Sequence, residues 1–319
     1  MSTVILNCAT FHIERHQEIT MTTTELPSQR RSALPPLGPD SLTWHRFGDW
    51  RTALLISWSG TLQVMHPVID TALVQHSAVF GNEFARLARS AGPIIRALYD
   101  PTGAEAQMIR DMHKDIKGTT DEGRRYHALN PGPYFWAHAT FLGTQYVVAE
   151  YFGEPLGDSE KEQLYQESKQ WYALYGVSAT NLPETYADFV DYWDEMVGTV
   201  LDKTETVRRS RVLNGQPTPR PDDRIPAVLW RLVGPVLGRL LVWIARGTLP
   251  PAARDKLGWE WSADDERRLR RFGAAVRLGF RFVPERWRLT PVARRACDGT
   301  VSRGPKRRPL AFGCPGSAH

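Results

Sequence analysis

The spacing of apolar residues predicts helices through most of the chain. From Trp44 onward, apolar side chains recur three and four positions apart, and stretches that alternate apolar and polar residues are hard to find. Prolines and glycines divide this pattern, because proline removes a backbone donor and glycine favours helix ends. The predicted helices span residues 50–65, 68–80, 83–99, 102–117, 133–152, 159–175, 182–201 and 225–245. We therefore expect an all-α fold.

The two ends of the chain differ from its middle in composition. Residues 1–40 are rich in Thr, Ser and Pro and predict a mobile leader, whereas 41–290 predict one all-α domain. A polar linker near 213–224 precedes an apolar helix at 225–246. Between positions 267 and 308 there are 14 Lys or Arg against two acidic residues. Residues 291–319 therefore predict a basic, flexible tail.

The apolar segment at 225–245 is long enough to cross a bilayer, but its composition argues against a span. Arg231 and Arg239 interrupt it, and an arginine is costly at the centre of a membrane. At about 100° per residue, Arg231, Arg239 and Arg246 share an arc of about 80° on the helix. A buried helix or one that lies on a membrane surface is favoured, and the basic C-terminal part fits peripheral membrane contact. No aromatic nucleic-acid motif accompanies the basic residues, so we expect no nucleic-acid partner.

The number and spacing of the cysteines argue against several kinds of site. The three cysteines, Cys8, Cys297 and Cys314, form no Cys-x-x-Cys pair, so a disulfide framework and a zinc-thiolate site are not expected. The absence of Cys-x-x-Cys-His means that any haem would be bound non-covalently. The start of the chain has no basic segment followed by an apolar run, so we expect no secretory signal and a cytoplasmic protein.

Two histidines on apolar helix faces are the main candidates for chemistry. His113 completes the stripe of Ile109, Met112 and Ile116, with Arg110 at its edge. His138 lies among aromatic residues three and four positions away. Each could be a core histidine bonded to a neighbour, or a ligand of a metal or haem iron, because a buried imidazole needs a partner.

Three further histidines are weaker candidates. His66 completes the stripe of Leu62, Met65 and Ile69 and could contact a cofactor, although a helix-end histidine bonded to a nearby carbonyl is the simpler interpretation. His76 and His127 lie near predicted helix boundaries, where surface or capping roles are expected.

Missing motifs exclude several enzyme classes. The chain has no Glu-x-x-His pair, His-Glu-x-x-His helix, Gly-x-Ser-x-Gly elbow, Walker phosphate loop or Gly-x-Gly-x-x-Gly turn. These absences argue against di-iron, zinc-protease, hydrolase and nucleotide-binding interpretations. A helical protein with inward histidines, an arginine and 33 aromatic residues (11 Trp, 10 Tyr, 12 Phe) is compatible with non-covalent haem.

The order of motifs resembles the MpaB-like and rubber oxygenase (latex-clearing protein) catalytic domain family over roughly residues 45–285. The motifs are Leu-Gln-Val-Met-His-Pro (62–67), His-Ser-Ala-Val-Phe (76–80), His-Lys-Asp-Ile-Lys-Gly (113–118), Tyr-His-Ala-Leu-Asn-Pro (126–131), Trp-Ala-His-Ala-Thr (136–140) and Leu-Pro-Glu-Thr (182–185). The resemblance implies an all-α, globin-like domain that binds haem b and cleaves carbon-carbon double bonds of isoprenoid chains.

The same resemblance implies roles for three residues. The proximal iron ligand falls on His138, in the Trp-x-His-Ala helix. The distal side falls on Arg110 and His113, with His113 at the position where rubber oxygenases have lysine. The carboxylate proposed as a base in rubber oxygenases aligns with no residue here.

We therefore expect a haem-dependent oxygenase that uses O2 and a lipophilic alkene. Two alternatives stay open: a non-catalytic haem protein in which both histidines ligate the iron, and a cofactor-free helical module that binds lipid or protein.

Overall fold

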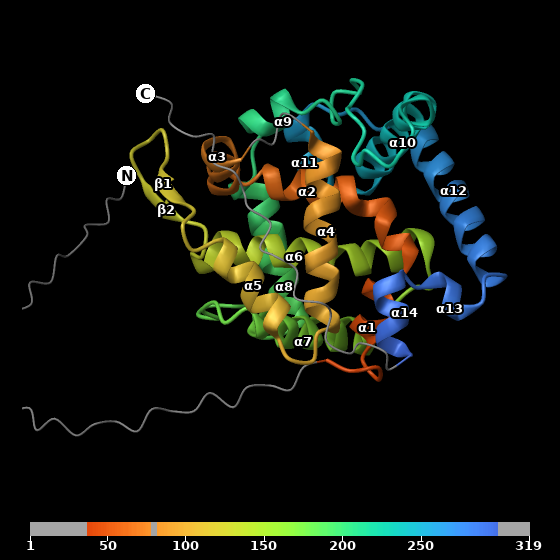
Figure 1. The fold of residues 1–319 in the computed structure, drawn as a ribbon, viewed down its shortest axis with the longest axis horizontal. Coiled ribbons are helices and arrows are strands. Elements are labelled where there is room, and N and C mark those ends of the chain that lie inside the picture. Colours follow the sequence, from red (N-terminus) through yellow and green to blue (C-terminus); the bar gives the residue numbers. More distant parts are fainter. Residues whose placement is uncertain (1–36, 78–81, 299–319) are drawn as a thin grey trace, which may run out of the picture. The chain divides into compact units, whose positions relative to one another are not determined.

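Helices form nearly all of the regular structure in the computed structural model, which describes residues 37–77 and 82–298 (Figure 1). The all-α prediction is confirmed. The first half contains α1 (Leu42–Phe47), η1 (Trp50–Leu55), α2 (Ile56–Val64), α3 (Pro67–His76), α4 (Glu83–Tyr99), α5 (Ala104–Met112), β1 (Lys117–Thr119), β2 (Arg125–His127), α6 (Pro131–Val147) and η2 (Val148–Phe152). The second half contains α7 (Asp158–Leu174), α8 (Tyr186–Glu195), η3 (Met196–Val200), α9 (Glu205–Arg209), α10 (Ala227–Thr248), α11 (Pro251–Leu257), α12 (Ala263–Arg281), α13 (Glu285–Arg288) and α14 (Pro291–Cys297).

Local sequence explains where several helices begin. Thr185 and Asp188 form a reciprocal capping box at the start of α8, and Ser262 and Asp265 do the same for α12. These bonds satisfy backbone N–H groups that have no partner within the helix. Proline opens α6, where its fixed φ and missing N–H carry no penalty.

Helix α6 is central to the core because both of its flanks are buried. It packs against α2 on one side and α7 on the other. The indole N–H of Trp136 in α6 donates to the Leu62 carbonyl in α2 at 3.0 Å. The Trp58 indole of α2 donates in turn to the Thr248 carbonyl at the end of α10. Buried indoles thus bind three helices through hydrogen bonds as well as through apolar contact.

The segment after α5 differs from the sequence prediction. The helix predicted at 102–117 ends at Met112, and residues 117–119 pair antiparallel with 125–127. Gly123 has a φ of 79° in the connecting turn. The sequence pattern missed this hairpin because its strands are three residues long and only Tyr126 is buried in them.

The C-terminal part is ordered further than predicted. Residues 291–297, assigned to the start of a flexible tail, form α14, with Ala293 and Ala296 buried. The Thr290 N–H donates to the Gly48 carbonyl at 2.8 Å and holds α14 beside α1. The helix predicted at 68–80 ends at His76, because Ser77 is extended. Residues 78–80, the predicted leader up to residue 36 and the rest of the tail lie outside the described residues.

Candidate functional site

His138 lies in the middle of α6, with only 2% of its surface exposed. Four aromatic rings surround its imidazole, with ring centroids at 4.8 Å for Trp171, 5.3 Å for Tyr172, 6.0 Å for Tyr175 and 6.4 Å for Phe135. The sequence placed this side chain inward, and the structure agrees. Trp171 and Tyr172 come from α7, which packs along this face of α6, and Tyr175 is the C-cap residue of α7.

The hydrogen bonds of His138 define its tautomer. Nε2 lies 3.0 Å from the Ser168 carbonyl oxygen and 2.9 Å from the Ser168 Oγ. Because a carbonyl can only accept, Nε2 carries the proton and donates it to Ser168. Nδ1 is therefore bare, and it is buried with no hydrogen-bond partner. The ring thus has one lone pair that nothing in the described protein uses.

Burial also fixes the charge of this imidazole. Desolvation lowers the pKa of His138 to about 4, against a smaller opposing effect of the bond to Ser168. The ring is neutral near pH 7, and a neutral imidazole with its other N–H held by a carbonyl is the form that ligates metals. The donor chemistry therefore fits an axial ligand of haem iron. Any group that reaches Nδ1 must displace at least one of the surrounding rings, because the atom is inaccessible.

His113 lies at the end of a helix rather than within one. It follows the last residue of α5, and its side chain is partly exposed. Nδ1 donates to the Ile109 carbonyl at 2.7 Å, which leaves Nε2 bare. Burial, opposed by the Ile109 bond and aided by nearby Arg86, lowers the pKa of His113. The predicted inward stripe is wrong at Met112, which is 39% exposed because the helix ends there.

Arg110 is held by an ion pair next to the tyrosines. Its guanidinium donates to the Asp111 carboxylate at 2.8 Å, and hydrogen bonds from Lys114 and Arg110 lower the pKa of Asp111. A side chain at Gly176 would meet the Arg110 guanidinium at 3.0 Å, so the arginine lies against the turn that follows α7.

A layer of three tyrosines, Tyr134, Tyr172 and Tyr175, separates His113 from His138. Tyr134 packs edge-on against His113 at 5.9 Å and against Tyr175 at 5.6 Å, and Tyr175 in turn contacts His138. Burial raises the pKa of all three phenols, and the Tyr134 hydroxyl is buried without a partner. The two histidines therefore lie on opposite sides of this tyrosine layer.

The other histidines have local roles. His66 is buried at the N-cap of α3, and its Nδ1 accepts from the Val68 N–H at 3.2 Å, so the predicted bond to a carbonyl is corrected to an acceptor cap. Desolvation lowers the pKa of His66 to about 4. His76 bonds the Lys117 carbonyl, and the His127 Nδ1 accepts from the Leu129 N–H.

Sequence reasoning missed the contribution of α7. Ser168, Trp171, Tyr172 and Tyr175 lie three, four and seven positions apart, a spacing that places them on one helix face. This stripe could have been found by the same periodicity that identified His138. Ser168 carries no apolar signal, and nothing in its position reveals that it binds a histidine 30 residues away.

A metal ion alone has no cluster of ligands here. Across residues 37–77 and 82–298, no group of three or more His, Cys, Asp or Glu side chains could hold one. The described chain thus offers single imidazole donors.

Comparison with known proteins gives the family. Residues 44–278 match the model of the family described as ER-bound oxygenase mpaB/B'/Rubber oxygenase, catalytic domain. Two uncharacterized mycobacterial proteins, from Mycobacterium bovis and Mycobacterium tuberculosis, are each 23% identical to the chain over 218 residues, which is 67% of this chain and 81% of theirs. No solved structure matches the chain significantly. Since the family model spans most of the chain and includes every helix that builds the site, the protein belongs to the mpaB and rubber oxygenase catalytic-domain family.

Proposed function

We propose that this protein is a haem b-dependent oxygenase that cleaves a carbon-carbon double bond of a lipophilic, isoprenoid-like alkene. The observation that carries the proposal is the bare, buried Nδ1 of His138 inside an aromatic cluster. An unpaired buried polar atom costs about 1 to 3 kcal/mol, so a fold that keeps one at its centre gains when a ligand pairs with it.

A single imidazole suits haem better than a free metal ion. A structural or catalytic zinc ion needs three or four protein ligands, whereas haem iron already has four nitrogen ligands and would need as few as one from the protein. His138 would hold the iron, and the bond from Nε2 to Ser168 would keep the ring in the ligating tautomer. Haem bound there would supply the iron that activates dioxygen.

The residues across the tyrosine layer have a separate task. His113 has a bare Nε2 and a lowered pKa, and Arg110 carries a permanent positive charge close to Tyr134. A guanidinium of this kind stabilises negative charge as it develops on oxygen. We assign Arg110 to this stabilisation, assign the bare Nε2 of His113 to accepting a proton or hydrogen bond on the same side, and leave His66 as a structural cap.

The overall reaction balances without an added reductant. One alkene and one dioxygen molecule give two carbonyl products, because the double bond and the O–O bond break while two C=O bonds form. The aromatic side chains around His138 would exclude water and pack against an apolar chain. A cytoplasmic location stays a prediction.

An optical experiment tests the haem proposal. The purified protein is titrated with haemin, reduced with dithionite and exposed to carbon monoxide. We expect a Soret band that shifts on reduction and again with carbon monoxide, and we expect His138→Ala to abolish stable binding. No Soret band, or a spectrum unchanged in His138→Ala, would overturn the assignment. A six-coordinate spectrum that ignores carbon monoxide would instead indicate the bis-histidine protein.

The activity is tested separately with squalene as an isoprenoid alkene. The reconstituted protein and squalene are incubated under O2, and carbonyl products are trapped with a hydrazine and identified by mass spectrometry. We expect incorporation of both atoms of labelled O2 into the two fragments. Haem binding without carbonyl products would contradict the proposed reaction while leaving the cofactor assignment intact.

A further inference from the structure

The first half of α10 exposes a wide apolar face to solvent. Leu232 is 69% exposed, Val228 61% and Val236 60%, and Leu229 and Val233 are about half exposed. At about 100° per residue these five side chains span an arc of about 140°. Isolated apolar residues on a surface are ordinary, whereas five on one face of one helix mark an interaction site.

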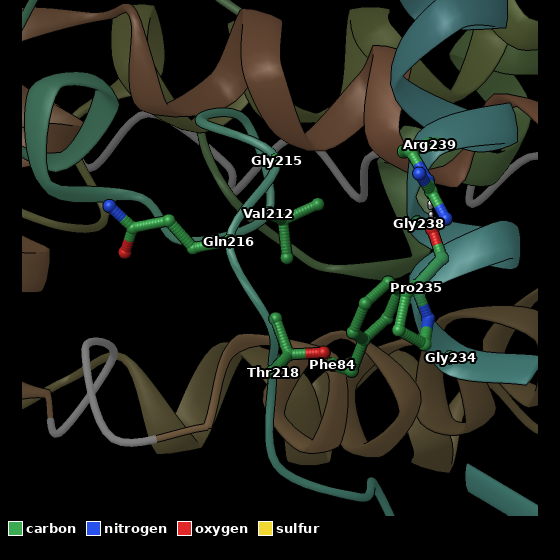
Figure 2. A pocket seen from close by; sticks show the side chains of 9 residues that line it. All are labelled: Phe84, Val212, Gly215, Gln216, Thr218, Gly234, Pro235, Gly238 and Arg239. Atoms are coloured by element: carbon green, nitrogen blue, oxygen red, sulfur yellow. Dashed lines mark hydrogen bonds between the residues drawn. The ribbon is translucent and has the colours of Figure 1, made fainter. Parts of the chain in front are cut away.

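The opposite side of this half-helix is fixed to the protein. The Trp230 indole donates to the Thr218 carbonyl at 2.9 Å and packs edge-on against Phe84. Figure 2 shows Phe84 and the segment around Thr218 beside Gly234 and Pro235 of α10. The cavity between them has a volume of about 20 Å³, which is room for about one water molecule. The exposed face is therefore presented by a supported helix.

This helix cannot leave the fold to cross a bilayer. It is the one helix among the described residues whose length and composition would allow a span. Its second half is built into the core, with Leu241, Ile244 and Ala245 buried and Thr248 bonded to Trp58. The free part, from residue 227 to about 240, is about 20 Å long, well short of a hydrocarbon core of about 30 Å.

A positively charged edge borders the apolar face. The chain has five arginines and no acidic residue from 224 to 254. Arg231, Arg239 and Arg246 share one edge of α10, and no carboxylate of the described residues lies within ion-pair distance of them, although Arg246 interacts with Asp265 at longer range. An apolar face bordered by arginines is complementary to a membrane surface that carries anionic headgroups.

A groove on the charged edge has the chemistry of a headgroup site. It has a volume of about 400 Å³ and is lined by Arg239, Arg246, Trp243, Trp259 and the 213–215 segment. The Arg246 guanidinium stacks over Trp259 at 5.2 Å, and its buried Nε has no hydrogen-bond partner. Arg239 uses only its Nε, which donates to the Pro235 carbonyl at 3.1 Å. The terminal nitrogens of both arginines are left for an anion.

We propose that α10 docks the protein onto an anionic lipid bilayer. Val228, Leu229, Leu232, Val233 and Val236 enter the interface, and the groove holds the phosphate of a lipid headgroup between Arg239 and Arg246. The tryptophans lie at the level of the headgroups, where amphipathic rings are favoured. This proposal rests on surface features alone and does not depend on the cofactor or the reaction.

Vesicle co-sedimentation of the full-length protein tests the docking. One set of vesicles is phosphatidylcholine alone, and the other has a third of its lipid replaced by phosphatidylglycerol. We expect binding to the anionic vesicles that weakens as salt is added. The double change Leu232→Gln and Val236→Gln should weaken this binding about tenfold or more, because two large apolar side chains no longer enter the interface. Equal binding by this variant and the parent would overturn the proposal.

Matched variants separate the two parts of the surface. Arg239→Gln with Arg246→Gln should weaken binding to anionic vesicles about thirtyfold, the effect of two arginines near an anionic surface, and should weaken binding to phosphatidylcholine less, because its headgroup has no net charge. Val74→Gln with Val190→Gln, and Lys117→Gln with Arg125→Gln, alter exposed residues elsewhere and should have no effect. An equal loss in these controls would show that the groove and the apolar face are not the docking site.

Two further measurements keep the test decisive. Circular dichroism and thermal melting must match the parent for every variant, and this check matters most for Arg246→Gln because that side chain is partly buried against Trp259. Light scattering in the absence of lipid then checks for self-association. A dimer that dissociates in Leu232→Gln with Val236→Gln, together with no vesicle binding, would assign the apolar face to a second copy of the chain and reject the membrane.

Discussion

The Nε2 of His138 donates to the backbone carbonyl of Ser168, 3.0 Å away and 30 residues along the chain. This bond joins the centre of α6 to α7 and decides which nitrogen of the ring is bare. Because the acceptor is a backbone carbonyl, the tautomer is set by the packing of two helices. The bond that orients the proposed ligand is thus part of the fold itself.

The haem-free protein should not need His138 for stability. We expect His138→Leu to change the free energy of unfolding by less than about 1 kcal/mol, because the gain from removing the unpaired buried Nδ1 is offset by the loss of the hydrogen bond from Nε2 to Ser168. Urea unfolding monitored by circular dichroism measures this.

A second buried histidine provides the control. In His66→Leu the change removes a nitrogen that caps α3, so a loss of about 1 kcal/mol is expected. An equal loss of unfolding free energy in His138→Leu and His66→Leu would show that the bare Nδ1 of His138 does not destabilise the haem-free protein.

Two residues of the tyrosine layer should respond oppositely to the loss of their hydroxyl groups, one by a gain and the other by a loss of stability. Tyr134→Phe removes a buried hydroxyl that has no partner, and we expect it to stabilise the haem-free protein by about 1 kcal/mol. Tyr172→Phe removes a hydroxyl that donates to the Ser178 carbonyl at 3.3 Å, and a loss of up to about 1 kcal/mol is expected. The midpoint of thermal unfolding should rise in Tyr134→Phe and fall in Tyr172→Phe. Midpoints that shift in the same direction in both variants would contradict this prediction.

The sequence predicts the position of His138 correctly and that of His113 only in part. His138 was placed inward because aromatic residues recur around it at helical spacing, and α6 extends well beyond it on both sides. His113 has the same local spacing, but its helix ends one residue earlier. Hydrophobic periodicity reports which face is buried and says little about where a helix ends, so the predicted inward stripe is wrong at Met112 and the predicted helix does not extend to Ile116.

Contacts between residues far apart in the chain could not be predicted from the spacing of apolar residues. The bond from His138 to Ser168 and the position of Tyr134 between Tyr175 and His113 depend on how helices pack. The short hairpin also escaped, since three-residue strands are below the length at which alternation can be recognised. The all-α fold and the course of α10, by contrast, follow from periodicity and from the spacing of proline and glycine.

Stability should fall in mild acid because burial lowers the pKa of both His66 and His138 to about 4, and the contribution of His66 can be tested alone. The folded pKa of His66, about 4, is below the ordinary value of 6.5, so the unfolded chain binds the proton more readily. Its contribution is therefore fully present above about pH 6.5 and is lost as the pH falls towards 4. The shift corresponds to about 3 kcal/mol by linkage.

A substitution that keeps the cap isolates this effect. His66→Asn retains a side-chain acceptor for the Val68 N–H but cannot take up a proton. Urea unfolding at a series of pH values between 4 and 7 should show a shallower loss of stability in the variant than in the parent. Parallel curves for the two proteins would assign the acid sensitivity to other groups.

Two glycines of α12 predict opposite effects of one added methyl group. Gly273 faces η2, and a Cβ there would collide with the backbone carbonyl of Tyr151, which cannot rotate away as a side chain could. We expect Gly273→Ala to destabilise the protein by about 2 kcal/mol or more, because α12 must move off η2.

Gly279 lies in the same helix with nothing near its Cβ position. Gly279→Ala should stabilise it by up to about 1 kcal/mol through helix propensity. The midpoints of thermal unfolding of the two variants test both expectations. An unchanged midpoint in Gly273→Ala would mean that α12 does not pack against η2 as closely as described.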